Sequence, residues 1–142
     1  MNIKVVKRNG KKEPVMLDKI LDRITQQTYG LDKLIIPFEV AQKVIEGIYD
    51  GITTKELDQL AAETAAYLST VHPDYNIIAG RIAVSNLHKE TKGCFSENLK
   101  EMYHYVNPIT GAHSPLVSKE LYDVVMENAQ TLDKVLVDKR DF

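Results

Sequence analysis

The sequence predicts a mainly α-helical protein: a four-helix bundle capped by an N-terminal β-hairpin and followed by additional short helices. Four segments between residues 18 and 93 repeat apolar residues at helical spacing, and the links between them are short. Two β-prone runs near the N-terminus flank an Asn-Gly pair, which is typical of a hairpin. With 142 residues, 44% of them hydrophobic, the chain can bury the core of one ordinary domain, with or without an appendage.

The hairpin is predicted from residues 3–8 (IKVVKR) and 12–17 (KEPVML). Asn9 and Gly10, which lie between these runs, tolerate the positive φ angles of a tight turn. Pro14 cannot donate a ladder hydrogen bond. We therefore expect the second arm to present Pro14 to an edge rather than to a strand partner.

The first two helices of the bundle have start and stop signals of their own. Asp18 stands where the N-cap of the first helix is expected, and Gly30 is expected to close it. The second helix is predicted to begin at Pro37, because proline suits the first turn of a helix, and to end at Gly51.

Thr53 and Glu56 have the spacing of a capping box, which predicts the start of the third helix. Pro73 ends that helix, and the fourth is expected to run to about Gly93. The segment SENLKEMYHYV then predicts a fifth short helix, NPITGAHSP a loop, and SKELYDVVMENAQTLDKVLV one or two more helices.

The composition argues against several classes of protein. Lys and Arg number 18 against 20 Asp and Glu, so no global positive field favours nucleic acid or an anionic membrane. Cys94 is the only cysteine, which excludes an internal disulfide or a multi-cysteine zinc site. No stretch approaches the ~18 apolar residues of a membrane span. We therefore expect a cytoplasmic protein without nucleic-acid or membrane partners.

No catalytic residue is predicted, and no bound transition metal. The seven glycines build neither GxGxxG nor GxxxxGK[ST], so a phosphate-cradling glycine loop is absent from the sequence. The four histidines form no close helical pair of metal ligands. Serine, histidine and aspartate are scattered, without a spacing that indicates a nucleophile and its base.

The basic residues in and just after the hairpin can be interpreted in two ways from the sequence alone. Lys7, Arg8 and Lys19 converge near one helix N-terminus, where free backbone N–H groups add positive potential and a polyphosphate could bind. Lysine and arginine on a solvated hairpin are also commonplace, and composition by itself favours this second reading.

Longer stretches carry a resemblance to a known family. The segments VVKRNGKKEPVMLDKI, YDGITTKELDQLAAETAAYL and HPDYNIIAGRIAVSNLHKETK resemble the ATP-cone, the nucleotide-sensing domain at the N-terminus of many ribonucleotide reductases. The resemblance continues through YVNPITGAHSPLV to DKRDF and is nearest to the large subunit of class I reductases of the eukaryotic type. It implies an ATP-cone regulatory domain in residues 1–93 and the helical start of the large-subunit N-terminal region in residues 94–142, with the catalytic barrel absent.

The resemblance implies a site for ATP or dATP, with Mg²⁺, under the hairpin. The residues expected near the phosphates or assisting there are Lys7, Arg8, Lys19, Thr54 and Lys89. The wall expected to hold the adenine, in which Glu13 or Asp18 accepts from the amine, also contains Val15, Met16 and Leu17. Asp58 is expected near the ribose, because ATP and dATP differ by one hydroxyl that a buried acceptor can sense. Asn9 replaces an aspartate that is common in the family's turn.

The implied function is allosteric control of overall activity. In the family ATP keeps ribonucleoside-diphosphate reductase active, and dATP drives large subunits into inhibited oligomers. The implied partners are other large-subunit protomers and the radical-generating small subunit. The parent protein would be an oxidoreductase of deoxyribonucleotide synthesis, while this chain would be regulatory. The alternative is a helical protein-interaction domain whose degenerate cone no longer binds nucleotide.

Overall fold

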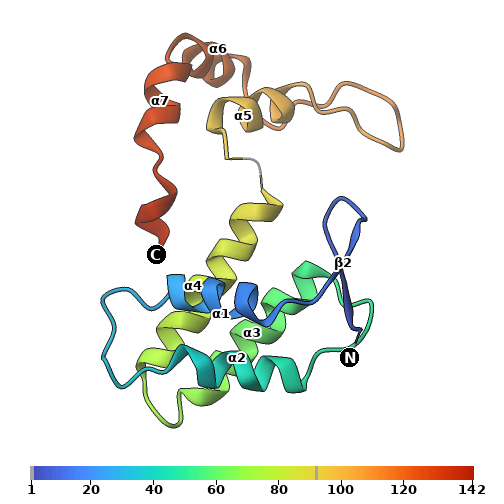
Figure 1. The fold of residues 1–142 in the computed structure, drawn as a ribbon. Coiled ribbons are helices and arrows are strands. Elements are labelled where there is room, and N and C mark those ends of the chain that lie inside the picture. The colour runs from blue at the N-terminus through green and yellow to red at the C-terminus, as the bar shows by residue number, and fades with distance from the viewer. Residues whose placement is uncertain (1, 92) are drawn as a thin grey trace. The chain divides into compact units, whose positions relative to one another are not determined.

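The computed structural model describes residues 2–91 and 93–142, and it confirms the mainly α fold (Figure 1). The described residues up to Leu87 form one compact unit, and those from His88 onward form a second. The expected domain boundary after residue 93 stays a prediction. The elements of the first unit are β1 (Lys4–Val6), β2 (Lys12–Pro14), α1 (Leu17–Gln26), α2 (Pro37–Glu46), α3 (Thr54–Leu68) and most of α4 (Asp74–Glu90).

Strands β1 and β2 form the predicted hairpin, an antiparallel pair in which Val5 lies opposite Glu13. The turn between them uses positive φ at Gly10 alone, with φ +79°. A two-stranded hairpin is marginal by itself in water. Here it is anchored to the segment before α3, because the amide of Val6 donates to the carbonyl of Ile52 at 2.9 Å and the amide of Gly51 donates to that of Lys4 at 2.9 Å.

Pro14 lies opposite Lys4 in the ladder, so it does have a strand neighbour, but its nitrogen faces the open edge of β2, as expected. The ladder still accommodates the proline. The amide of Lys7 donates to Lys11 and that of Val15 donates to Ile3. In an antiparallel pair the bonded positions alternate, so Pro14 falls at a non-hydrogen-bonded position where its missing N–H costs nothing.

Helix α1 starts earlier than predicted, and the assignment of Asp18 as its N-cap is wrong. Met16, in an extended conformation, takes the N-cap position, and Asp18 lies in the first turn. There its carboxylate still faces the positive end of the helix dipole. Helix α1 also ends at Gln26, before Gly30, whose φ of +70° belongs to the loop that follows.

Helices α2 and α3 begin as the sequence predicts. Pro37 occupies the first turn of α2, and the capping box of Thr53 and Glu56 is formed at α3. Helix α2 ends at Glu46, well before the predicted Gly51, whose φ is +84°. The earlier end leaves residues 47–53 to form turns that bring Gly51 and Ile52 to the hairpin.

The core of the first unit lies between its four helices. Its fully buried members come from every helix and include Ile24, Val44, Ala65 and Ile78. Tyr75 is buried as well, and its hydroxyl accepts from the amide of Ile36 at 3.1 Å. The predicted four-helix bundle with a hairpin cap is therefore confirmed as the architecture of this unit.

The second unit contains α5 (Phe95–Tyr103), α6 (Lys119–Glu127), α7 (Ala129–Val135) and the 3₁₀ turn η1 (Asp138–Asp141). Tyr103 and Tyr122 stack with ring centroids 4.2 Å apart, which joins α5 to α6. Asp133 on α7 accepts from the amide of Ser96 at 2.9 Å and thereby satisfies a free N–H in the first turn of α5. The described residues after the bundle form three helices and a short 3₁₀ turn, in line with the predicted additional short helices.

Thr53→Ala should lower the free energy of unfolding by about 1 kcal/mol, the usual cost of a lost N-cap side chain. The hydroxyl of Thr53 accepts from the amide of Glu56 at 3.2 Å, and it donates to the Glu56 carboxylate at 2.8 Å. Urea unfolding followed by circular dichroism measures the change. Thr53→Ser keeps the hydroxyl and should stay near the unaltered chain; an equal loss in both variants would contradict the capping role.

Candidate functional site: a pocket under the hairpin

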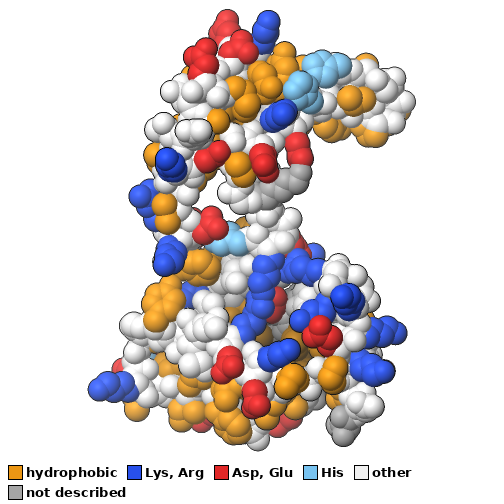
Figure 2. Space-filling view, turned by 45° about the horizontal axis from the view of Figure 1, so that its top comes forward, with side chains coloured by type: hydrophobic (Ala, Val, Ile, Leu, Met, Phe, Trp, Pro, Cys, Tyr) orange, Lys and Arg blue, Asp and Glu red, His pale blue; other side chains and the backbone are white. Residues whose placement is uncertain are grey.

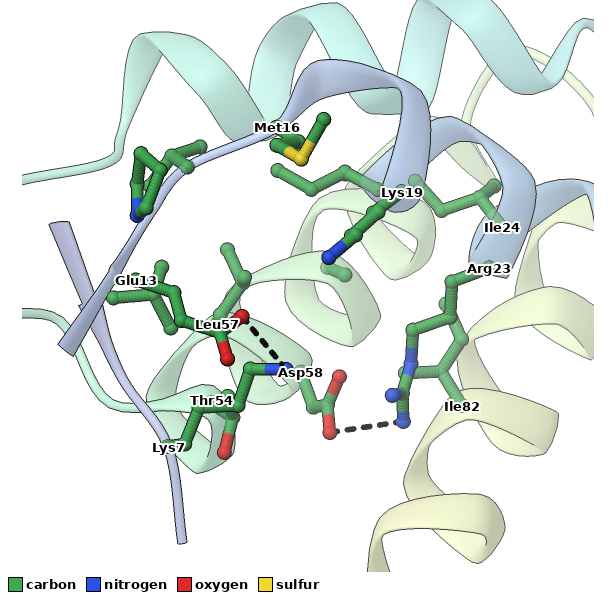
Figure 3. Close-up of a pocket in the computed structure, with 15 residues that line it drawn as sticks. Lys7, Glu13, Met16, Lys19, Arg23, Ile24, Thr54, Leu57, Asp58 and Ile82 are labelled. Carbon is green, nitrogen blue, oxygen red and sulfur yellow. Dashed lines mark hydrogen bonds and ion pairs between the residues drawn. The ribbon is translucent and has the colours of Figure 1, made fainter. Parts of the chain in front are cut away.

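A pocket of about 210 Å³ lies between the hairpin, α1 and α3, and it is closed on one side by Ile82 of α4 (Figure 3). Its size is below the roughly 300–1,000 Å³ of pockets that enclose a drug-sized ligand. A larger ligand would therefore lie partly in solvent. The fold creates the pocket because the segment from Pro14 to Met16 crosses from the hairpin to the start of α1.

One wall of the pocket is apolar. Val15 and Met16 contribute from the segment before α1, Ile20 from α1, and Leu57 and Ala61 from α3. Met16 is about half exposed, which leaves an apolar surface available to a ligand. A flat, weakly hydrated group such as an aromatic ring or a nucleobase is the kind of ligand that such a wall favours.

Two cations reach the pocket, Lys7 from the hairpin and Lys19 from α1, beside Met16 of the apolar wall (Figure 3). The Nζ of Lys7 lies 3.1 Å from the Glu13 carboxylate, and Lys19 extends from α1 into the pocket (Figure 3). Basic side chains gather on the hairpin side of the first unit (Figure 2). The hydrogen bond and the charge of Lys7 hold the pKa of Glu13 below its usual value. Both residues of that pair are well exposed, so an anionic ligand can compete with Glu13 for Lys7 at little cost.

The floor of the pocket holds an ion pair between α1 and α3. The Nη2 of Arg23 lies 2.9 Å from Oδ2 of Asp58. The Asp58 side chain is 5% exposed and that of Arg23 is 33% exposed. Among the residues that the structure describes, Asp58 is the one buried charged side chain. A buried carboxylate is costly unless it is paired, so the pair has a structural role as well as lining the pocket.

The structure brings most of the predicted site residues together. Those that line the pocket are Lys7, Glu13, Val15, Met16, Lys19, Thr54 and Asp58. The other four lie outside the set of described residues that line it. The Arg8 guanidinium donates to Oδ1 of Asn86 at 2.8 Å. Leu17 and Asp18 are exposed in the first turn of α1. Lys89 lies in the last turn of α4, within the second unit. Their assignment to a nucleotide stays a prediction.

Sequence reasoning missed Arg23, Leu57 and Ile82 as pocket residues, and also Val5, Ile20, Ile24 and Ala61. Arg23 had a usable signal, since it follows Lys19 by four positions and so lies on the same face of α1. Leu57 likewise follows the predicted Thr54 by three positions and so lies on the same face of α3. Ile82 had no local signal, because it reads as an ordinary core residue of α4.

Lys7→Met should raise the pKa of Glu13 towards its usual value, because both leading causes of the depression come from Lys7. A depressed carboxyl pKa stabilises the folded state above the unfolded-state pKa, and this contribution disappears as pH falls through the folded-state pKa. NMR titration of the Glu13 side chain measures the shift. Lys12→Met is the matched control, and an unchanged pKa in Lys7→Met would contradict the pairing.

The described residues hold no cluster of three or more His, Cys, Asp or Glu side chains that could bind a metal ion. Nor does any described helix combine the length and apolar character that a membrane crossing needs.

The fold and the pocket define a class of protein: a hairpin-capped helical domain whose ligand pocket joins an apolar wall to a basic edge. The ATP cone domain family matches residues 3–90, and the chain belongs to this family. The resemblance read from the sequence is thereby confirmed, and with it a nucleotide-binding regulatory domain at the level of the family.

The relatives are large subunits of one enzyme. The chain is 53% identical over 139 residues to ribonucleoside-diphosphate reductase large chain 2 of Saccharomyces cerevisiae, covering 97% of this chain and 16% of that protein. It is 53% identical to the large subunit from Danio rerio and 55% identical to that from Variola virus, each over 97% of this chain and 18% of the relative. The chain thus spans less than a fifth of the length of these relatives.

Proposed function

We propose that this chain is the nucleotide-sensing domain of a ribonucleoside-diphosphate reductase large subunit, and that its pocket binds ATP or dATP as an allosteric effector. One observation carries the proposal: a single pocket combines an apolar wall, the cations Lys7 and Lys19, and the buried carboxylate of Asp58. These three features match the base, the phosphates and the sugar of a nucleotide. Membership of the ATP-cone family supports the same ligand class.

The base is proposed to lie against Val15 and Met16, with Glu13 accepting from the exocyclic amine of adenine. The phosphates then extend towards Lys7 and Lys19, where charge-assisted hydrogen bonds are about twice as strong as neutral ones. Because the pocket is small, the terminal phosphates and Mg²⁺ would remain in solvent, and the ion would be held mainly by phosphate oxygens and water.

Asp58 is proposed to tell the two nucleotides apart. Its carboxylate accepts hydrogen bonds and repels phosphate, so the ribose hydroxyls are the ligand groups that suit it. ATP has a 2′-hydroxyl that can donate to Asp58, and dATP has none. A site built around such an acceptor discriminates by the presence of the hydroxyl, as an apolar wall cannot.

In the intact subunit the bound nucleotide is proposed to set overall activity by changing how large subunits associate with one another and with the small subunit. This requires ATP and dATP to favour different assemblies, since an effector shifts an equilibrium only by its differential affinity. Reduction of ribonucleoside diphosphates and a cytoplasmic location belong to the same proposal, because the relatives are reductase large subunits. Light scattering of an intact subunit with saturating dATP should show an increased mass, and an unchanged mass would contradict this part.

Calorimetric titration of the 142-residue chain with ATP, dATP and adenosine tests the ligand assignment. Both triphosphates should bind with dissociation constants below about 1 mM, and adenosine more weakly because it lacks the phosphates that the lysines contact. Absence of binding by ATP and dATP at millimolar concentration would favour the alternative, a helical interaction domain with a degenerate cone.

A further inference from the structure

A side-chain hydrogen bond links the turn of the hairpin to helix α4. The Nη2 of Arg8 donates to Oδ1 of Asn86 at 2.8 Å, across 78 positions of the sequence. Asn86 follows Ile82 by four positions and so lies on the same face of α4, about 6 Å further along the helix. Figure 3 shows Lys7 on the hairpin side of the pocket and Ile82 on the α4 side. The hydrogen bond therefore joins the two elements that flank the pocket, one step beyond the lining residue of each.

We infer that Asn86 is the positioning residue that holds Arg8 ready for the terminal phosphates of the bound nucleotide. The inference rests on the proposed function and deepens it, because it names what orients a cation at the rim of the same site. The pocket, of about 210 Å³, is too small to enclose a nucleoside triphosphate. Phosphates that extend past Lys7 leave the pocket where Arg8, the next residue of the chain, is held.

The amide of Asn86 orients the guanidinium without neutralising it. Lys7, the neighbouring cation, lies 3.1 Å from the Glu13 carboxylate. Among the residues that the structure describes, Arg8 forms no ion pair, and its hydrogen-bond partner is uncharged. A guanidinium has five N–H donors, of which Asn86 occupies one, so the others can form a bidentate contact with a phosphate. Arg8 thus keeps both its charge and its fork of donors for a ligand.

The hydrogen bond is better explained by the ligand than by the placement of the hairpin. The hairpin is already anchored to the chain before α3 by backbone hydrogen bonds to Ile52 and from Gly51. Arg8 is exposed, and ordering an exposed arginine on a ligand costs conformational entropy. Asn86 has a short side chain on a regular helix, and it restricts Arg8 before the ligand arrives. Part of the ordering cost is therefore met in the free protein.

The test compares affinities for ATP, AMP and adenosine by calorimetry in the unaltered chain and in Asn86→Ala, Asn86→Gln and Asn76→Ala. Asn86→Ala should weaken ATP binding by about threefold to tenfold, and binding of AMP and adenosine by less than about twofold, because these lack the terminal phosphates. Asn86→Gln keeps the amide and should recover most of the ATP affinity. Asn76 is exposed on the same helix and lies outside the described residues that line the pocket. Asn76→Ala is therefore the matched control and should leave the ATP affinity unchanged.

Asn86→Asp separates a positioning role from a purely structural one. A carboxylate at this position strengthens the link to Arg8, but it neutralises the guanidinium and repels phosphate. We expect ATP binding to weaken by about tenfold or more, beyond the loss in Asn86→Ala. If the link served only to hold the hairpin in place, Asn86→Asp would bind ATP as tightly as the unaltered chain, and the inference would be wrong.

A double-mutant cycle assigns the effect to Arg8. Arg8→Met should weaken ATP binding by about tenfold, and adding Asn86→Ala should then change it by less than about twofold. Lys33→Met, which removes one positive charge from the exposed loop after α1, is the control for net charge. An unchanged ATP affinity in Asn86→Ala, or an equal loss beside Arg8→Met, would overturn the inference and leave nucleotide binding intact. If the unaltered chain bound neither ATP nor dATP, the proposed function would fail, and the inference with it.

Discussion

Lys19→Met should weaken the binding of both ATP and dATP by about tenfold to a hundredfold. Hydrogen bonds that involve a charged group contribute about 1.5–3 kcal/mol, and each 1.4 kcal/mol corresponds to about tenfold in affinity. Lys19 extends from the exposed face of α1 into the pocket, so methionine preserves the apolar stem and removes the charge (Figure 3). The cause of the loss can therefore be assigned to the ammonium group.

Comparing the affinities for ATP and for adenosine identifies which part of the ligand Lys19 contacts. Because the lysine is proposed to face phosphate, adenosine affinity should change little in Lys19→Met, and the advantage of ATP over adenosine should shrink. Lys33→Met serves as the control for net charge. An equal loss for adenosine and ATP would place Lys19 at the base or would indicate a general disturbance of the pocket.

Ile78→Ala should lower the free energy of unfolding by about 2–5 kcal/mol, because it leaves a cavity in a core that can relax only partly. Ile78 is 0% exposed and packs within the core of the first unit, outside the described residues that line the pocket. A loss of this size is a large part of the stability of an ordinary domain. Urea unfolding followed by circular dichroism measures it.

Ile77→Ala is the matched control for the cavity effect, since it makes the same chemical change one position earlier on the same helix. Ile77 is 44% exposed. Its substitution should change the unfolding free energy by no more than about 0.5 kcal/mol. Similar losses at both positions would mean that helix propensity, and not burial, dominates the stability of α4.

Short sequence motifs predicted the helix starts that are set by the residues at the start itself. The capping box at Thr53 and the proline at Pro37 start their helices where expected, because each satisfies or tolerates the free N–H groups of a first turn. Helix ends were placed too late at Gly30 and Gly51. Both glycines have positive φ, but they serve loops beyond the helix, and for Gly51 the loop conformation is set by bonding to the hairpin.

The candidate site could be predicted in part for the same reason. Residues close in sequence to the hairpin, such as Lys7 and Met16, reach the pocket because the chain there is short and continuous. The pairing of Arg23 with Asp58 depends on how α1 packs in the bundle, which no local pattern reports. Leu17, adjacent to Met16, begins α1 and is outside the described residues that line the pocket, because the chain changes from extended to helical at that point.

The central claim is that adenine nucleotides occupy the pocket under the hairpin, and NMR mapping of backbone amides during titration with ATP and dATP tests it most directly. The account predicts saturable shifts at Lys7, Met16, Lys19 and Asp58, with the two nucleotides differing most around Asp58 and Arg23. Shifts confined to residues outside the pocket, or no saturable shift with either nucleotide, would contradict it.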